Sequence, residues 1–252
     1  MHSLQNKTVL LTGASSRIGE SIARKLAGAG ARLVLVAPSE AALTRLAGEL
    51  TETYGAQCTA ITADLSRPDF PATLQNEIAS QNIQVDVLIN NASFGSHRPF
   101  ATLAAETEFR EMAVNISSVV RLTQAFIPDM LARKSGAVLN ISAIEAIQPG
   151  PYRAVFATTK AFVVSFTEAF WAEFQSRGVH VAALCPSPVK VGGVVVNPES
   201  VAELALKALQ VSSPTHIAGF KQWLLAKLIR YAPQRVVAKV GAELLLPAVL
   251  KS

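Results

Sequence analysis

Short apolar runs rich in β-branched residues recur along the chain, and longer stretches of helical period separate them. The runs are TVLLT (8–12), RLVLVA (32–37), CTAITA (58–63), VDVLIN (85–90), GAVLNIS (136–142), VHVAALC (179–185) and THIAG (215–219). Amphipathic stretches at 18–29, 40–54 and 154–176 lie between them. Regular strand–helix alternation predicts a doubly wound α/β fold of about seven parallel strands, with helices on both faces. At 252 residues, 50% of them apolar, we expect one Rossmann-type domain spanning 1–252.

Charge and cysteine usage narrow the function classes. The formal charge of +5 comes from Lys and Arg residues that are scattered along the chain, which argues against a nucleic-acid interface. Cys58 and Cys185 lie far apart without a CxxC or His cluster, so the sequence predicts neither a metal site nor a disulfide. The first residues lack a signal-peptide pattern, and no apolar run approaches the roughly 18 residues of a membrane span. We therefore expect a cytoplasmic protein.

The C-terminal segment, residues 219–252, differs in composition from the rest of the chain. Its charged residues are mainly basic and alternate with apolar ones; the basic residues are Lys221, Lys227, Arg230, Arg235, Lys239 and Lys251. A basic amphipathic helix can lie on a membrane surface or dock on a partner. The commoner alternative is a last helix that covers the sheet and leaves its charges in water.

A glycine turn follows the first predicted strand in TGASSRIGESIARKL, residues 12–26. Such a turn before a helix suits a pyrophosphate, because backbone N–H groups and the helix dipole favour an anion there. Further motifs follow in order: ADL (63–65), NNA (90–92), Asn115, NIS (140–142), Lys160 and CPSPV (185–189). Over nearly its whole length, the chain resembles the short-chain dehydrogenase/reductase family.

The resemblance implies binding of NADP or NAD and oxidoreduction of a small apolar carbonyl or alcohol. The positions that would contact the dinucleotide are Gly13, Ser15, Ser16, Arg17, Ile18, Gly19, Pro38, Asp64, Leu65, Asn91, Ala92, Lys160, Pro186 and Val189. It also implies a homodimer or homotetramer formed through two long helices, at 103–133 and 154–176.

The catalytic positions depart from the family pattern. In the family a tyrosine exchanges a proton with the substrate oxygen, and a lysine four residues later lowers the tyrosine pKa. A serine thirteen residues before the tyrosine steadies the substrate oxygen, and an asparagine positions the lysine. Asn115 and Lys160 are present, but Phe156 and Ala143 stand where the tyrosine and serine belong. Losing an acid/base group costs about 10²- to 10⁴-fold in rate, so we expect a pseudoenzyme with little redox turnover.

Two nearby hydroxyls offer substitutes. Ser142 neighbours Ala143, but adjacent strand residues point to opposite faces unless the strand bulges. Tyr152 lies one helical turn before Phe156, where it either acts as a substitute acid or lines the mouth of the substrate site. An active reductase that uses Tyr152 therefore remains the alternative to a non-catalytic scaffold that binds a ligand or partner.

The motifs that would bind the cofactor also depart from the family pattern. Arg17 replaces a glycine of TGxxxGxG, and it either pairs with the pyrophosphate or occupies its volume. Ser93 and Ser187 replace glycines in two further motifs. Pro38 stands where the family distinguishes NADP from NAD, and it offers neither charge nor donor. These changes predict weakened dinucleotide binding and leave the choice of dinucleotide open.

The retained residues also have purely structural interpretations. Lys160 can be one end of a solvated ion pair, and Asn115 can cap or kink the long helix. Asp64 can be the N-cap of a helix at 66–76.

Overall fold

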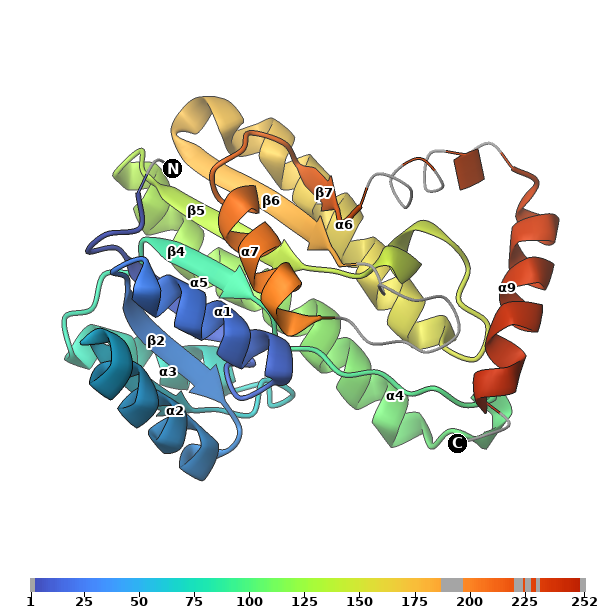
Figure 1. Ribbon diagram of the computed structural model, residues 1–252, viewed down its shortest axis with the longest axis horizontal. Coiled ribbons are helices and arrows are strands. Elements are labelled where there is room, and N and C mark those ends of the chain that lie inside the picture. Colours follow the sequence, from blue (N-terminus) through green and yellow to red (C-terminus); the bar gives the residue numbers. More distant parts are fainter. Residues whose placement is uncertain (1–2, 187–196, 220–223, 225–227, 230–231, 250–252) are drawn as a thin grey trace.

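The fold is a seven-stranded parallel sheet, in the order β3-β2-β1-β4-β5-β6-β7 (Figure 1). The structure is a computed structural model, and it describes residues 3–186, 197–219, 224, 228–229 and 232–249. The strands are β1 (Thr8–Thr12), β2 (Arg32–Ala37), β3 (Cys58–Thr62), β4 (Val87–Asn90), β5 (Gly136–Ile141), β6 (Val179–Cys185) and β7 (Thr215–Ile217). The fold class predicted from the alternating pattern is thereby confirmed.

Helices cover both faces of the sheet. On one face lie α1 (Arg17–Gly28), α2 (Glu40–Tyr54) and α7 (Pro198–Ala208), which share a buried apolar cluster with the strands. On the other lie α3 (Phe70–Ser80), α5 (Ser118–Ala132) and α6 (Ala154–Phe174), with a second cluster. Because both faces are buried, the strands read as nearly continuous apolar runs. The carboxyl ends of β1 and β4 meet where the strand order reverses, which is where such sheets bind ligands.

The long helix predicted at 103–133 is interrupted. Helix α4 (Ala105–Met112) passes into a π-helical turn, Ala113–Ser117, before α5 begins at Ser118. Asn115 lies in this turn, and its side-chain amide bonds to backbone outside the helix (Asn115 Nδ2 to Phe94 O, 2.9 Å). The helix is therefore interrupted at Asn115, by a π-helical turn.

The prediction of a helix at 66–76 with Asp64 as its N-cap is wrong. Helix α3 begins at Phe70 with Asp69 at the N-cap position. Pro68 removes an N–H and disfavours helical backbone at the preceding residue, so the chain cannot become helical before it. Asp64 instead closes a local turn, accepting bonds from the Ser66 N–H (3.0 Å) and hydroxyl (2.7 Å).

The C-terminal helix does not cover the sheet. Helix α9 (Gln234–Val249) stands beyond α6 and α4 (Figure 1), and Gly241 lies close to Pro149 and Pro151 in the loop before α6. The expectation that the last helix packs over the sheet is therefore wrong for α9. Within the parts of the chain that the structure describes, no helix is both long and apolar enough to cross a membrane.

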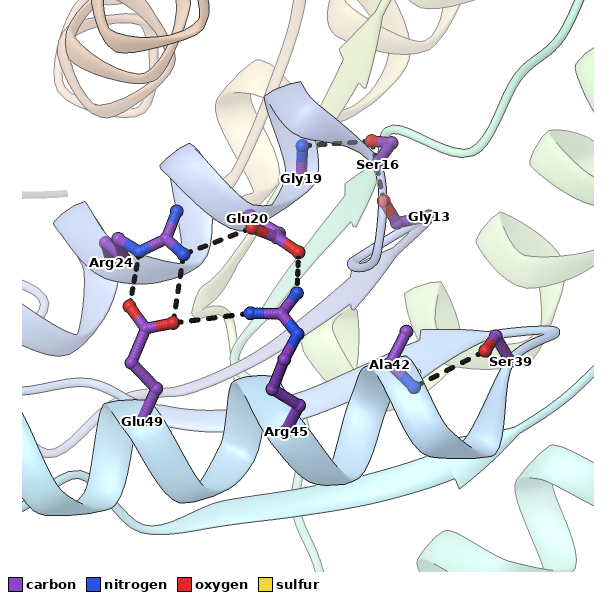
Figure 2. Close-up of polar contacts among 9 residues, drawn as sticks. All are labelled: Gly13, Ser16, Gly19, Glu20, Arg24, Ser39, Ala42, Arg45 and Glu49. Carbon is purple, nitrogen blue, oxygen red and sulfur yellow. Dashed lines mark hydrogen bonds and ion pairs between the residues drawn. The ribbon is translucent and has the colours of Figure 1, made fainter.

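Ion pairs join α1 to α2 on the outside of the sheet (Figure 2). Arg24 contacts Glu49 at 2.6 Å and Glu20 at 3.1 Å, and Arg45 pairs with both acids. These residues are partly or largely exposed, so each pair contributes little by itself. The orientation of α1 against the sheet is set by its buried apolar face, which includes Ile22 and Leu26.

Mutation to alanine should change the stability in opposite directions at two helical glycines. A Cβ on Gly19 would lie 2.1 Å from the Gly13 carbonyl oxygen, whereas one on Gly48 would meet nothing within 4 Å. We expect Gly19→Ala to lower the free energy of unfolding by about 1–3 kcal/mol through overpacking. Gly48→Ala should raise it by about 1 kcal/mol through helix propensity. Urea unfolding of both variants measures this, and a neutral Gly19→Ala would contradict the close packing of the loop.

Candidate functional site

The turn between β1 and α1 has the geometry of an anion-binding loop. Gly13 has a φ of 62°, a conformation that favours glycine. Ser16 caps α1: its hydroxyl accepts from the Gly19 N–H at 3.0 Å and donates to the Gly13 carbonyl at 2.8 Å (Figure 2). The N–H groups of Arg17 and Ile18 belong to the first turn, where no preceding carbonyl accepts them. The loop thus offers a positive helix end at the crevice.

Asn91 ties the end of β4 to this loop. Its side-chain amide nitrogen lies 3.0 Å from the carbonyl oxygens of both Thr12 and Gly13. The Thr12 hydroxyl accepts from the backbone N–H groups of Asn91 (3.0 Å) and Ala92 (3.1 Å). These bonds hold the two strand ends together at the point where the strand order reverses.

One cavity, which we name the Asp64 cavity, lies on the β2–β3 side of the loop. It has a volume of about 360 Å³, and its lining includes Gly13, Ser15, Ser16, Pro38, Asp64, Leu65, Ala92, Ser93 and Arg110. Hydrogen bonds from Ser66 lower the pKa of Asp64, so its carboxylate is charged at neutral pH. Arg110, which the sequence analysis did not single out, lies 3.4 Å from that carboxylate and is exposed.

A second cavity, the Phe156 cavity, lies on the β5 side. It has a volume of about 380 Å³ and is lined by Ser16, Arg17, Ile18, Asn91, Ser93, Ile141, Ser142, Ala143, Glu145, Arg153, Phe156, Lys160 and Pro186. Ser16 and Ser93 border both cavities, so the two adjoin at the N-terminus of α1. The structure therefore brings Ala143, Phe156 and Lys160 together.

The ring of Phe156 is held between the loop after β4 and two basic side chains. A Cβ on Gly95 would lie 2.3 Å from the ring, so the backbone there packs directly against it. The Arg153 guanidinium carbon is 4.3 Å from the ring centroid, and the Lys160 Nζ is 5.6 Å from it. Both cations therefore lie within cation–π distance of a ring that has no hydroxyl.

Lys160 is buried, with 3% of its surface exposed, and its Nζ donates to the Ile141 carbonyl at 3.0 Å. Burial lowers the pKa of Lys160 from 10.5 to about 8, because the charged form loses its hydration. The interpretation of Lys160 as one end of a solvated ion pair is therefore wrong. At pH 7 roughly one-tenth of this amine is uncharged, far more than for an ordinary lysine.

The side chain of Asn115 hydrogen-bonds to the loop after β4 and to α6. Its side-chain oxygen accepts from the Phe94 N–H at 3.2 Å, and its nitrogen donates to the Phe94 carbonyl and to the Thr159 hydroxyl (3.1 Å). Thr159 precedes Lys160 on α6. Asn115 thus joins the loop after β4 to α6, and it contacts the helix beside Lys160.

Neither proposed substitute hydroxyl is placed like the missing tyrosine. The Ser142 hydroxyl is buried and donates to the backbone carbonyl of Lys160 at 2.9 Å. Tyr152 is half-buried, and the lining found for the Phe156 cavity among the described residues does not include it. Its backbone carbonyl instead accepts from the Arg98 N–H at 3.0 Å.

The structure adds two pairs of charged residues that sequence reasoning missed. Arg153 and Glu145 form an ion pair on the wall of the Phe156 cavity, and each side chain is 22% exposed. Glu108 and Glu111 are buried on α4, where they accept bonds from Ser96. Burial raises the pKa of Glu111. The spacing of three between Glu108 and Glu111 placed both on one helix face, but nothing marked that face as buried.

The two cavities lie on either side of the glycine turn and adjoin each other, as a site for a dinucleotide requires. The glycine turn and helix end suit the pyrophosphate, with the Asp64 cavity on one side for adenosine and the Phe156 cavity on the other for nicotinamide. Arg17 is exposed on the wall of the second cavity. Val189 and Ser187 lie outside the described residues.

Known proteins share both the sequence pattern and the fold. The short chain dehydrogenase family model matches residues 7–200. Oxidoreductase UcpA of Escherichia coli is 34% identical over 191 residues, which are 75% of this chain and 72% of that protein. A very-long-chain 3-oxoacyl-CoA reductase of Bos taurus is 28% identical over 246 residues, covering 88% of this chain and 78% of the relative.

Solved structures agree in fold. A short-chain dehydrogenase from Sphingobium yanoikuyae, in complex with NADPH, has a TM-score of 0.79 at 28% identity and covers 89% of this chain and 93% of its own. A metagenomic short-chain oxidoreductase in complex with NADP has a TM-score of 0.75 at 30% identity, covering 85% and 96%. With the family match spanning most of its length, the chain belongs to the short-chain dehydrogenase/reductase family.

Proposed function

We propose that this chain is a dinucleotide-binding member of its family in which carbonyl–alcohol redox activity is lost or strongly reduced. The observation that carries the proposal is the lining of the Phe156 cavity. A phenylalanine ring and the Ala143 methyl group stand where family members present two hydroxyls beside the lysine. The scaffold that holds the cofactor is kept, whereas the groups that move the proton are replaced.

A bound nicotinamide would donate or accept the hydride; the protein must move the accompanying proton. In this chain Gly13, Ser16 and the first turn of α1 would hold the pyrophosphate, and Lys160 would face the nicotinamide end. Phe156 has no proton to exchange with a substrate oxygen, and Ala143 has none to donate in a hydrogen bond. The Lys160 Nζ donates to the Ile141 carbonyl, and we expect this bond to hold the amine away from the place of the missing phenol.

Dinucleotide binding is tested by titration with NADPH and, in parallel, with NADH, followed by nicotinamide fluorescence. We expect saturable binding, because the glycine turn and both cavities are in place. Arg17→Gly separates the two roles of that side chain. Weaker binding by the variant shows that Arg17 pairs with the pyrophosphate, and tighter binding shows that it occupies the phosphate volume. No saturable signal from either protein would contradict retained binding.

A homodimer or homotetramer through α4, α5 and α6 remains our prediction. Phe162, Phe166, Phe170 and Phe174 form a ladder along α6, with successive ring centroids 5.6, 4.4 and 5.1 Å apart. The first three rings are only half-buried, which supports a partner over this face. A monomeric mass in solution scattering would contradict it.

A further inference from the structure

The Phe156 cavity contains a buried amine that the proposed function does not use chemically. Lys160 lines the cavity, and its Nζ has one hydrogen bond, to Ile141 O, among those found for the described residues. An uncharged amine that donates one N–H still carries a lone pair and a second N–H. In a family member with an intact tyrosine, the phenolate form of that tyrosine would favour the charged ammonium; here the neighbouring ring is Phe156.

We propose that Lys160 is a nucleophile that captures apolar aldehydes as an imine in the Phe156 cavity. This activity goes beyond the proposed function, and it requires no bound dinucleotide. It follows from the placement of a buried, desolvated lysine on the wall of a largely apolar cavity, an arrangement that activates lysines toward carbonyl compounds.

The cavity lining fits an apolar aldehyde. Much of the wall is apolar, from Ile18, Ile141, Ala143, Phe156 and Pro186. The charge of Arg153 is matched by Glu145, so that pair adds no net charge to the wall. Its volume of about 380 Å³ is within the usual range for small-molecule sites, about 300–1,000 Å³.

The charged and titratable groups that act on Lys160 come from several elements. Glu145 before α6 and Glu111 on α4 favour its charged form, Arg153 opposes it, and Cys185 on β6 faces it as a thiol. Burial outweighs them and lowers the pKa of Lys160 to about 8. The pKa of Cys185 is raised by its own burial to about 12, so this thiol stays neutral where Lys160 titrates.

The reaction balances without an oxidant or reductant. The Lys160 nitrogen attacks the carbonyl carbon, and the carbonyl oxygen becomes a hydroxyl as a carbinolamine forms. That hydroxyl then leaves as water, so both hydrogens of the uncharged amine depart with the carbonyl oxygen. A carbon–nitrogen double bond replaces the carbon–oxygen double bond, and the step is reversible.

The experiment uses the full chain, hexanal and cyanoborohydride at pH 7.5 without dinucleotide, followed by digestion and mass mapping of hexylated lysines. An amine with a pKa near 8 is uncharged roughly 10²-fold more often at this pH than an ordinary lysine. We therefore expect Lys160 to be labelled at least about 10-fold more than the exposed Lys207, with the ratio falling toward pH 10. Equal labelling of the two lysines at pH 7.5 would overturn the proposal.

Two variants sharpen the result without replacing Lys160. Phe156→Tyr should reduce labelling of Lys160, because the phenol oxygen can accept a hydrogen bond from the ammonium and its ionised form attracts that charge. Phe162→Tyr adds a hydroxyl to α6 at a position outside the described cavity lining and should leave labelling unchanged. Unchanged labelling in Phe156→Tyr would contradict the role of the missing phenol. Labelling of Lys160 by a protein that binds no NADPH would uphold this inference while the proposed function fails.

Discussion

NADPH-dependent carbonyl reduction is expected to rise by at least about 10²-fold in the double variant Phe156→Tyr/Ala143→Ser. The phenol restores a proton donor beside Lys160, and the serine restores a hydrogen-bond donor for the substrate oxygen. Acid/base groups contribute about 10²- to 10⁴-fold, and the two effects are not additive. Phe156→Tyr alone should give most of the gain, and Ala143→Ser alone should give little. Initial rates of NADPH oxidation with a panel of aliphatic aldehydes and ketones measure the change.

The controls separate proton transfer from cofactor binding. Phe162→Tyr should produce no activity, because its hydroxyl lies outside the described cavity lining. Adding Tyr152→Phe to the double variant should leave the rate unchanged, since Tyr152 does not line the cavity. If activity returns only after Arg17→Gly is added, the block lies in the phosphate loop. A variant that binds NADPH with all three changes and stays inactive would refute the assignment of Phe156 and Ala143.

Lys160→Met should change the pH dependence of stability more than any exposed lysine does. The pKa of Lys160 falls from 10.5 in its ordinary state to about 8 in the fold. Below pH 8 both folded and unfolded chains hold the proton, and the wild type bears the full cost of a buried ammonium. Between pH 8 and 10.5 only the unfolded chain holds it, so wild-type stability rises with pH. The stability of Lys160→Met relative to wild type should therefore fall by about 3 kcal/mol from pH 7 to pH 10.5.

Denaturant unfolding of both proteins across this pH range measures the difference, which also cancels titrations that the proteins share. Lys207→Met is the matched control: Lys207 is exposed on α7, so its removal takes no buried ammonium away. A constant difference between Lys160→Met and wild type would show that Lys160 keeps its ordinary pKa in the fold. That result would also remove the support for imine formation.

The fold was predictable because its signals are local and repeated. Each buried parallel strand is a short apolar run, and α2 has the predicted bounds, with Ser39 as its N-cap and Gly55 after its end. Prediction failed where one residue overrides the periodic pattern: Pro68 delays α3 until Phe70. An interruption at Asn115 was predicted, but not the π-helical turn through which it divides α4 from α5. The place of α9 depends on contacts with the loop at 149–151, which no local pattern records.

The candidate site was likewise predicted only in part. Ala143, Phe156, Lys160 and the glycine turn were found from motif order, and the structure gathers them around two adjoining cavities. Arg153, Glu145 and Arg110 were missed because a single charged residue outside a motif carries no signal of its own. Their positions become significant only in the fold, which places Arg153 and Glu145 on the wall of the Phe156 cavity and Arg110 beside Asp64. Sequence order thus identifies residues that act through a motif, and tertiary structure identifies those that act through proximity.

The most direct test of the central claim is single-turnover hydride transfer from bound NADPH by the wild-type chain, compared under identical conditions with a family relative that has the tyrosine and serine. We predict a rate at least about 10²-fold below that of the relative for every carbonyl compound that both proteins bind. A wild-type rate equal to that of the relative would contradict the claim that Phe156 and Ala143 remove the proton-transfer step.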